Sequence, residues 1–227
     1  MNHRNELPET VTALIGAYRR GEVSPVEVVE EHLARVERLE PDLNAFVSVH
    51  ADEARAAAGA SAARWARREP CGDLDGVPVT VKDIVAMAGH PTSEGSSTGS
   101  NEPETDDSPP VARLREAGAV FLGKTTTSEF GWKGMTDTPR FGITRNPWNH
   151  ELTPGGSSGG SSAAVAAGMV PLATATDAGG STRQPAAYTG TVGLLPAHGR
   201  IPKANGFSNW SCHGAVTRSV LETARYL

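Results

Sequence analysis

Short apolar runs alternate with amphipathic helical segments along this chain, and the alternation restricts the folds that it can adopt. The first helical segment places Val11, Leu14, Ile15 and Tyr18 at the i, i+3, i+4, i+7 spacing of one helix face, and Gly21 stands where a C-cap would end it. Strands separated by helices are typical of layered α/β domains. We therefore expect an α/β fold in which helices cover a sheet.

Further helices and strands continue this alternation. Ser24 and Glu27 form a capping-box pattern with Pro25 at the first helical position, and this opens a second helix that extends through Leu39. Residues 89–107, rich in glycine, serine, threonine and acids, are the clearest long loop in the sequence. The other expected elements are strands within residues 43–50, 75–89, 119–130 and 172–177, and helices at 52–69, at 109–118, in the alanine-rich segment after residue 160, from residue 181, and over 214–227.

Charge and cysteine content exclude several classes of protein. The net charge of −5 contains no block of like charge, which argues against nucleic acid or an anionic membrane as partner. Cys71 and Cys212 lie far apart without a CxxC pattern, so neither a disulfide framework nor a metal site is expected. The N-terminus lacks the apolar run of a signal peptide, and no window reaches the roughly 18 apolar residues of a membrane span. We expect a cytoplasmic protein.

A lysine within an apolar strand is the first candidate for chemistry. Lys82 directly follows the run "VPVTV", where burial would lower its pKa by disfavouring the charged form. A neutral lysine can act as a base. The sequence leaves open the alternative that Lys82 pairs with the adjacent Asp83 or extends its amine to solvent at the strand end.

Two serine-containing segments are the second candidate. In "LATATDAGGSTRQP" a strand ends at Asp177, and glycines precede Ser181 at the start of an expected helix. Backbone N–H groups of such a loop can converge beside the serine and form an oxyanion hole, although Ser181 could instead only cap the helix. The run from Thr153 to Gly168 is a flexible linker by composition, yet it leads directly into apolar segments.

A third pattern competes with this interpretation. Residues 155–159 satisfy the G-x-S-x-G pattern of the α/β-hydrolase nucleophile elbow. The elbow requires an apolar strand directly before it, whereas "TRNPWNHELTP" contains two prolines and no alternating apolar residues. The hydrolase-elbow interpretation is therefore disfavoured.

Together these features resemble the amidase signature family. Its hallmark is a block "GGSSGGS" followed by an alanine-rich helix, an apolar strand and D-x-GGS-x-R-x-PA, and the block is present here from Gly155 to Ala186. The segments "GVPVTVKD", "KTTTSEFGW", "FGITRNPWN", "GTVGLLPAHGRIP" and "GAVTRS" extend the similarity. The resemblance implies one domain over residues 1–227 with a central mixed β-sheet flanked by helices and preceded by N-terminal helices. It also implies that the C-terminal part of the family fold is missing.

The resemblance implies a Ser-Ser-Lys triad. Ser181 would be the acylated nucleophile, Lys82 the base and Ser157 the bridge between them, with a cis peptide bond at Gly156-Ser157. The family pattern also assigns supporting roles to further residues, listed here by role: backbone oxyanion donors Ala178, Gly179, Gly180 and Ser181; a hydrogen bond to Lys82 from Ser158; loop-holding residues Asp177 and Arg183; and pocket residues Gly131 and Trp132.

The function implied is amide hydrolysis through an acyl-enzyme, which releases an acid and ammonia or an amine without metal or organic cofactor. The substrate would be a small-molecule amide, and homo-oligomer formation stays open. Two alternatives remain. The chain could be the A subunit of a tRNA-dependent amidotransferase, which uses the same triad to release ammonia from glutamine, although "SEFGWKGMTDTPRFG" is more similar to stand-alone amidases. It could also be a non-catalytic, truncated relative.

Overall fold

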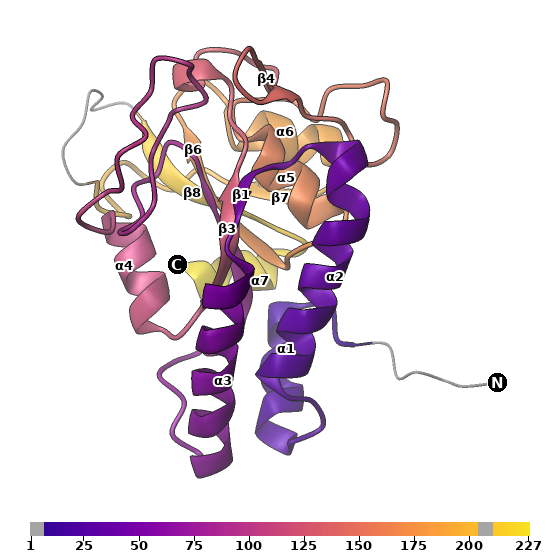
Figure 1. Cartoon of the computed structure of the whole chain (residues 1–227), viewed down its shortest axis with the longest axis vertical. Helices are drawn as coiled ribbons and strands as arrows, with labels where there is room; N and C mark the ends of the chain where they lie inside the picture. The colour runs from indigo at the N-terminus through magenta and orange to yellow at the C-terminus, as the bar shows by residue number, and fades with distance from the viewer. Residues whose placement is uncertain (1–6, 204–210) are drawn as a thin grey trace.

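A six-stranded mixed sheet forms the centre of the protein (Figure 1). The computed structural model describes residues 7–203 and 211–227. Strand order is β1-β3-β2-β6-β8-β7, in which β2 runs parallel to both β3 and β6 and the other pairs are antiparallel. The strands are β1 (Phe46–Val49), β2 (Pro78–Lys82), β3 (Val120–Thr125), β6 (Leu172–Asp177), β7 (Val192–Leu194) and β8 (Cys212–Thr217), with a separate β4 (Asp137–Thr138) and β5 (Gly142–Ile143) pair.

Helices pack against both faces of the sheet and form two apolar cores. One core joins α2 and α3 to α5 through residues such as Leu33, Ala58 and Val165. The other joins α1 and α4 to the opposite face through Leu14 and Leu114. The helices are α1 (Val11–Arg20), α2 (Pro25–Leu43), α3 (Ala51–Arg67), α4 (Pro109–Glu116), α5 (Gly159–Ala166), α6 (Arg183–Thr189) and α7 (Val220–Tyr226), with a 3-10 turn η1 (Glu129–Gly131). The expected α/β architecture is confirmed.

The N-terminal helices begin and end at the signals in the sequence. Helix α1 ends at Gly21, which adopts a left-handed φ of 68°. Ser24 and Glu27 make both hydrogen bonds of the capping box at the start of α2. Helix α2 continues through Pro41 to Leu43, four residues beyond the last predicted apolar position.

The end of the chain corrects the sequence prediction. The segment from Gly214 was expected to be helical, but residues Cys212–Thr217 form strand β8 between β6 and β7. Helix α7 begins only at Val220, capped by Ser219. The spacing predicted that Val216 lies on the apolar face of a helix, but it is buried in the core that packs against the sheet.

The topology brings the ends of β2 and β6 together. The two strands are adjacent and parallel, with Val79 opposite Leu172 and Thr80 opposite Ala173. Lys82 is the last residue of β2 and Asp177 the last of β6, so both lie at the carboxyl edge of the sheet. Long loops gather at the upper end in Figure 1, away from the lower ends of α1 and α3. Ligand sites of open α/β sheets lie at such carboxyl edges.

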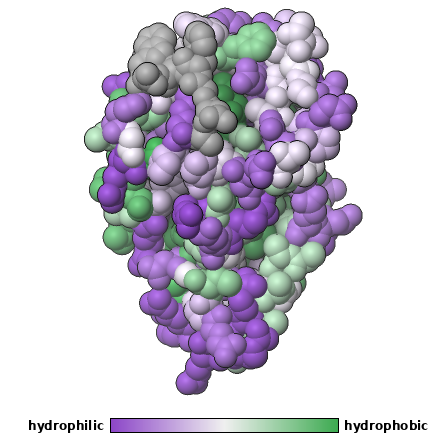
Figure 2. Space-filling model, turned by 90° about the vertical axis from the view of Figure 1, so that its left-hand side faces the viewer, coloured by the Kyte–Doolittle hydropathy of each residue, from purple (hydrophilic) through white to green (hydrophobic). Residues whose placement is uncertain are grey.

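One face of the molecule is largely polar. Figure 2 shows one face on which hydrophilic side chains predominate and hydrophobic ones form only small groups. No helix among the described residues is long and apolar enough to cross a membrane.

Candidate active site

Lys82 is fully buried at the end of β2 and contacts two hydroxyl groups. Its Nζ lies 2.7 Å from Ser157 Oγ and 2.8 Å from Thr176 Oγ1. Burial lowers the pKa of this amine to about 7, and the opposing effect of Asp177 is smaller. The amine is therefore about half neutral near pH 7, as a general base requires.

Asp83 turns away from Lys82 and binds a different lysine. Lys124 Nζ lies 3.4 Å from Asp83 Oδ1, and both side chains are buried. Ser93 and Gly95 also donate hydrogen bonds to the Asp83 carboxylate. The alternative in which Lys82 pairs with Asp83 is therefore wrong, as is the one with an exposed amine.

Two threonines of β6 hold Lys82, and the sequence analysis missed them. Thr174 Oγ1 accepts a hydrogen bond from the Lys82 main-chain N–H, and Thr176 Oγ1 accepts one from Nζ. The hydrogen bond expected from Ser158 is thus replaced by one to Thr176, because the Ser158 hydroxyl bonds to the Thr176 main chain. The sequence indicates only that Thr174 and Thr176, two residues apart, lie on one face of a strand, and not that this strand is adjacent to Lys82.

The Gly/Ser run is a tightly packed part of the site. The Gly156-Ser157 peptide bond is cis, and residues 155–165 are buried. A Cβ added to Gly156 would lie 2.7 Å from the main-chain nitrogen of Met135, and one added to Gly160 would lie 2.2 Å from Thr126 Oγ1. The glycines are therefore required by close packing, and the linker interpretation of the composition is wrong.

The loop that carries Ser181 is held by one buried carboxylate. Asp177 accepts hydrogen bonds from the N–H groups of Gly180, Thr182 and Arg183 and from the Arg183 guanidinium. Burial alone would raise its pKa, but these donors lower it below the usual value. Helix α6 begins at Arg183 and Thr182 occupies the N-cap, so Ser181 is not the cap. The Asp177 carboxylate thus ties the N–H groups of Gly180 and Thr182 to the Arg183 side chain.

The predicted oxyanion donors differ in their availability. Gly180 N–H already donates to Asp177 Oδ1 at 2.8 Å, so it is committed to the loop. Within the described parts of the chain, the N–H groups of Ala178, Gly179 and Ser181 make no hydrogen bond. Ala178 and Gly179 are exposed at the edge of the sheet. The donor set in this conformation is therefore narrower than the sequence predicted, because the Asp177 carboxylate takes one amide.

A cavity of about 580 Å³ joins these elements. Its lining includes Ser157, Thr176 and the loop from Ala178 to Ser181. Gly131 and Trp132 line it as well, and a Cβ on Gly131 would lie 3.4 Å from Ser157 Oγ. Of the predicted site residues, the two serines, the glycine loop, Gly131 and Trp132 thus line one cavity, whereas Lys82, Ser158, Asp177 and Arg183 do not line it. Ile84, Glu94 and Gln184 also line it and were not singled out from sequence.

Comparison with known proteins identifies the family. The family model described as Amidase matches residues 27–227. This chain belongs to the amidase family. Among curated relatives of this amidase-family chain, the A subunit of glutamyl-tRNA(Gln) amidotransferase from Halorhodospira halophila is 46% identical over 195 residues, covering 86% of the chain and 40% of the relative. An acylamidase of Rhodococcus erythropolis is 41% identical over 221 residues, which cover 96% of the present chain and 46% of the acylamidase.

Solved structures agree with that assignment. A bacterial aryl acylamidase that belongs to the amidase signature enzymes matches with a TM-score of 0.89 and 35% identity. This match covers 96% of the present chain and 46% of the aryl acylamidase. A peptide amidase in complex with the competitive inhibitor chymostatin matches with a TM-score of 0.89 and 33% identity. This match covers 96% of the present chain and 46% of the peptide amidase. The chain thus spans less than half the length of these relatives.

One group of side chains outside the cavity has metal-ligand chemistry. In the part of this amidase-family chain that the structure describes, ligand atoms of His50, Glu53 and His90 lie within 4.8 Å of one another. The two imidazoles stack at 3.7 Å with planes 12° apart. Ring nitrogens bind a metal in the ring plane, and two nearly parallel planes at this separation do not meet at one ion. As they stand, these residues are a stacked pair and not a formed metal centre.

Proposed function

We propose that this chain carries the catalytic machinery of an amide hydrolase that works through a Ser181 acyl-enzyme. Ser157 relays the proton and Lys82 accepts it. The observation that supports this most strongly is the contact between the fully buried Lys82 amine and Ser157 Oγ at 2.7 Å, with the amine pKa at about 7. A neutral lysine beside a serine hydroxyl is an activated base–hydroxyl pair.

The contacts of Lys82 suit proton transfer from the Ser157 hydroxyl to the Lys82 amine. When the amine is neutral, one N–H donates to Thr176 Oγ1, and the lone pair can accept the proton of the Ser157 hydroxyl. Thr176 thereby orients the amine. Ser157 Oγ is then able to accept the proton of Ser181, whose main-chain carbonyl is tied to the Ser157 segment through the N–H of Ser158 at 3.1 Å.

The bond changes follow from this relay. Ser181 Oγ forms a bond to the amide carbonyl carbon as its proton moves through Ser157 to Lys82. The tetrahedral intermediate collapses, the C–N bond breaks, and the proton held by Lys82 returns through Ser157 to the leaving nitrogen. Water then adds to the acyl carbon as its proton moves through Ser157 to Lys82; the bond to Ser181 Oγ breaks, the carboxylic acid leaves, and the proton returns to Ser181 Oγ. The negative oxygen would lie near the N–H groups of Ala178, Gly179 and Ser181, since these make no hydrogen bond within the described residues.

A fluorophosphonate probe tests this proposal in the intact protein. Ser181→Ala should abolish labelling, because the atom that forms the covalent bond is removed. His198→Ala and His213→Ala are matched controls and should still label, since no histidine takes part in the relay. Loss of labelling in either histidine variant, with Ser181→Ala still labelled, would instead support a serine hydrolase with a histidine base.

The strongest alternative is a glutaminase component of a tRNA-dependent amidotransferase. It is favoured by the relatives that are A subunits of glutamyl-tRNA(Gln) amidotransferases, which are as much as 46% identical. The same triad would then release ammonia from glutamine for partner subunits. Glutaminase activity together with co-purification of partner subunits would favour this alternative, whereas hydrolysis of small amides by the isolated protein favours a stand-alone amidase. A protein that neither labels nor hydrolyses any amide would be non-catalytic.

A further inference from the structure

One acidic side chain lines the cavity without a cationic partner. Glu94 lines the cavity together with Ile84, Phe130 and Trp132. Within the described residues its carboxylate makes no hydrogen bond and no ion pair. Burial raises its pKa above the usual value, and the nearby acids Asp83 and Glu104 raise it further. No cationic side chain among the described residues offsets these effects on the pKa of Glu94.

The two lysines of the same cavity do not neutralise Glu94. Lys133 Nζ lies 2.6 Å from Asp137 Oδ1, and Lys203 Nζ donates to Ser211 Oγ at 3.0 Å. Neither lysine contributes to the pKa shift of Glu94. The buried Lys124 is held by Asp83 behind the loop. A bound cation would thus supply a charge that the described protein does not.

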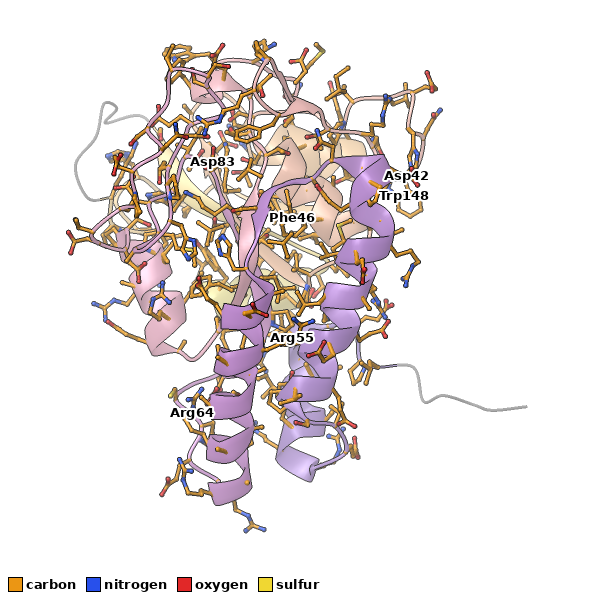
Figure 3. The ribbon with its side chains drawn as sticks, viewed as in Figure 1. Asp42, Phe46, Arg55, Arg64, Asp83 and Trp148 are labelled. Carbon is orange, nitrogen blue, oxygen red and sulfur yellow. The ribbon has the colours of Figure 1, made fainter. Side chains whose placement is uncertain are left out.

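The backbone fixes the position of this carboxylate. Glu94 adopts a left-handed φ of 53°, which is costly for a residue with a side chain and recurs at functional sites. Its N–H donates to the Asp83 carbonyl at 3.1 Å, and its carbonyl accepts from Phe130 N–H at 2.8 Å. Asp83 lies among the loops above the sheet (Figure 3), and its carboxylate binds the neighbours of Glu94 on both sides, Ser93 and Gly95.

We infer that Glu94 is a specificity-determining residue that selects amides carrying an alkylammonium or similar cationic group beside the scissile bond. Glu94 shares the cavity with Phe130 and Trp132, whose side chains are exposed, and this combination suits such a group because aromatic faces attract cations. Glu94, Phe130 and Gly131 line the same cavity as Ser157, and a Cβ on Gly131 would lie 3.4 Å from Ser157 Oγ, so this wall and the relay face one substrate site. The inference rests on the proposed amide hydrolase function.

Paired fluorophosphonates test the inference in the intact protein. Each pair has tails of equal length that end in an ammonium or in an isosteric methyl group, and the ratio of their second-order labelling rates is measured over several tail lengths. The ammonium probe should label faster at the best length. Glu94→Gln should lower that ratio of labelling rates by about tenfold, since the loss of one ion pair in partly buried surroundings changes a rate or an affinity by about this factor. Glu94→Lys should reverse the preference toward tails that end in a carboxylate.

Glu102→Gln is the matched control, because it removes the same charge from an exposed position on the same loop and should leave the ratio unchanged. A ratio that stays within about twofold of wild type in both Glu94 variants, with the methyl probe still labelling, would overturn the inference alone. An absence of labelling by every probe in the wild-type protein would instead overturn the proposed function, and the inference with it. The methyl probe also reports whether each variant is folded.

Discussion

Removal of the Thr176 hydroxyl should shift the pH dependence of acylation toward acid. Thr176 Oγ1 accepts a hydrogen bond from Lys82 Nζ at 2.8 Å, and an acceptor favours the charged form of the amine. In wild type the pKa of Lys82 lies at about 7, lowered from its ordinary value by burial. Because only the neutral amine accepts the proton, the rate should rise with pH through this pKa and level off above it.

The magnitude follows from the neutral fraction of Lys82. With a pKa of about 7, that fraction and the acylation rate should rise about tenfold between pH 6 and pH 8. Thr176→Val keeps the burial but removes the acceptor, which should lower the pKa by about one unit, since one hydrogen bond to a charged group is worth that much. The same rise should then be only about twofold.

The assay is the second-order rate of fluorophosphonate labelling, measured from pH 5 to pH 9 in wild type and in Thr176→Val. Circular dichroism across the range separates titration from unfolding. A wild-type rate that climbs about a hundredfold from pH 6 to pH 8 and continues to rise would mean that Lys82 keeps an ordinary pKa. That result would refute the burial argument, and a profile unchanged by Thr176→Val would refute the role given to this hydroxyl.

Three further perturbations test the relay and the loops. Ser157→Ala should slow labelling by about 10²–10⁴-fold, because it interrupts proton transfer, and residual labelling should persist at Ser181. Asp177→Ala should lower the free energy of unfolding by about 2 kcal/mol in urea titrations, since it leaves the buried N–H of Thr182 and the part-buried N–H of Gly180 without an acceptor; a loss below about 1 kcal/mol would contradict its loop-holding role. Gly131→Ala should slow labelling, because its Cβ would lie 3.1 Å from Ile84 Cδ1; Gly21→Ala, which has a similar φ but no atom within 4 Å, should label at the wild-type rate.

Much of the fold could be predicted because its signals are local. The cap at Gly21 and the capping box at Ser24 depend on neighbouring residues alone, and both are present. Strand β8 could not be predicted in this way, since its residues are fixed by pairing with β6 and β7, of which β6 lies far away in the sequence. A short apolar run that fits either period is decided by such pairing and not by its own spacing.

The site also has parts that local sequence patterns predict and parts that depend on the fold. Lys82, Ser157 and Ser181 stand in patterns that the sequence displays, so their neighbourhood could be predicted. Thr176 could not be chosen over Ser158 as the partner of Lys82, because that choice depends on how β6 and the start of α5 face each other. The packing around the Gly/Ser run was equally hidden, since it requires contacts with residues as distant as Thr126.

The most direct test of the central claim is peptide mapping of the covalently trapped protein. Ser157 and Ser181 line the same cavity, so labelling alone does not identify the nucleophile. The account predicts that the mass of the adduct appears on the peptide containing Ser181 and that the peptide containing Ser157 stays unmodified. An adduct on the Ser157 peptide, with none on the Ser181 peptide, would contradict it and exchange the roles of the two serines.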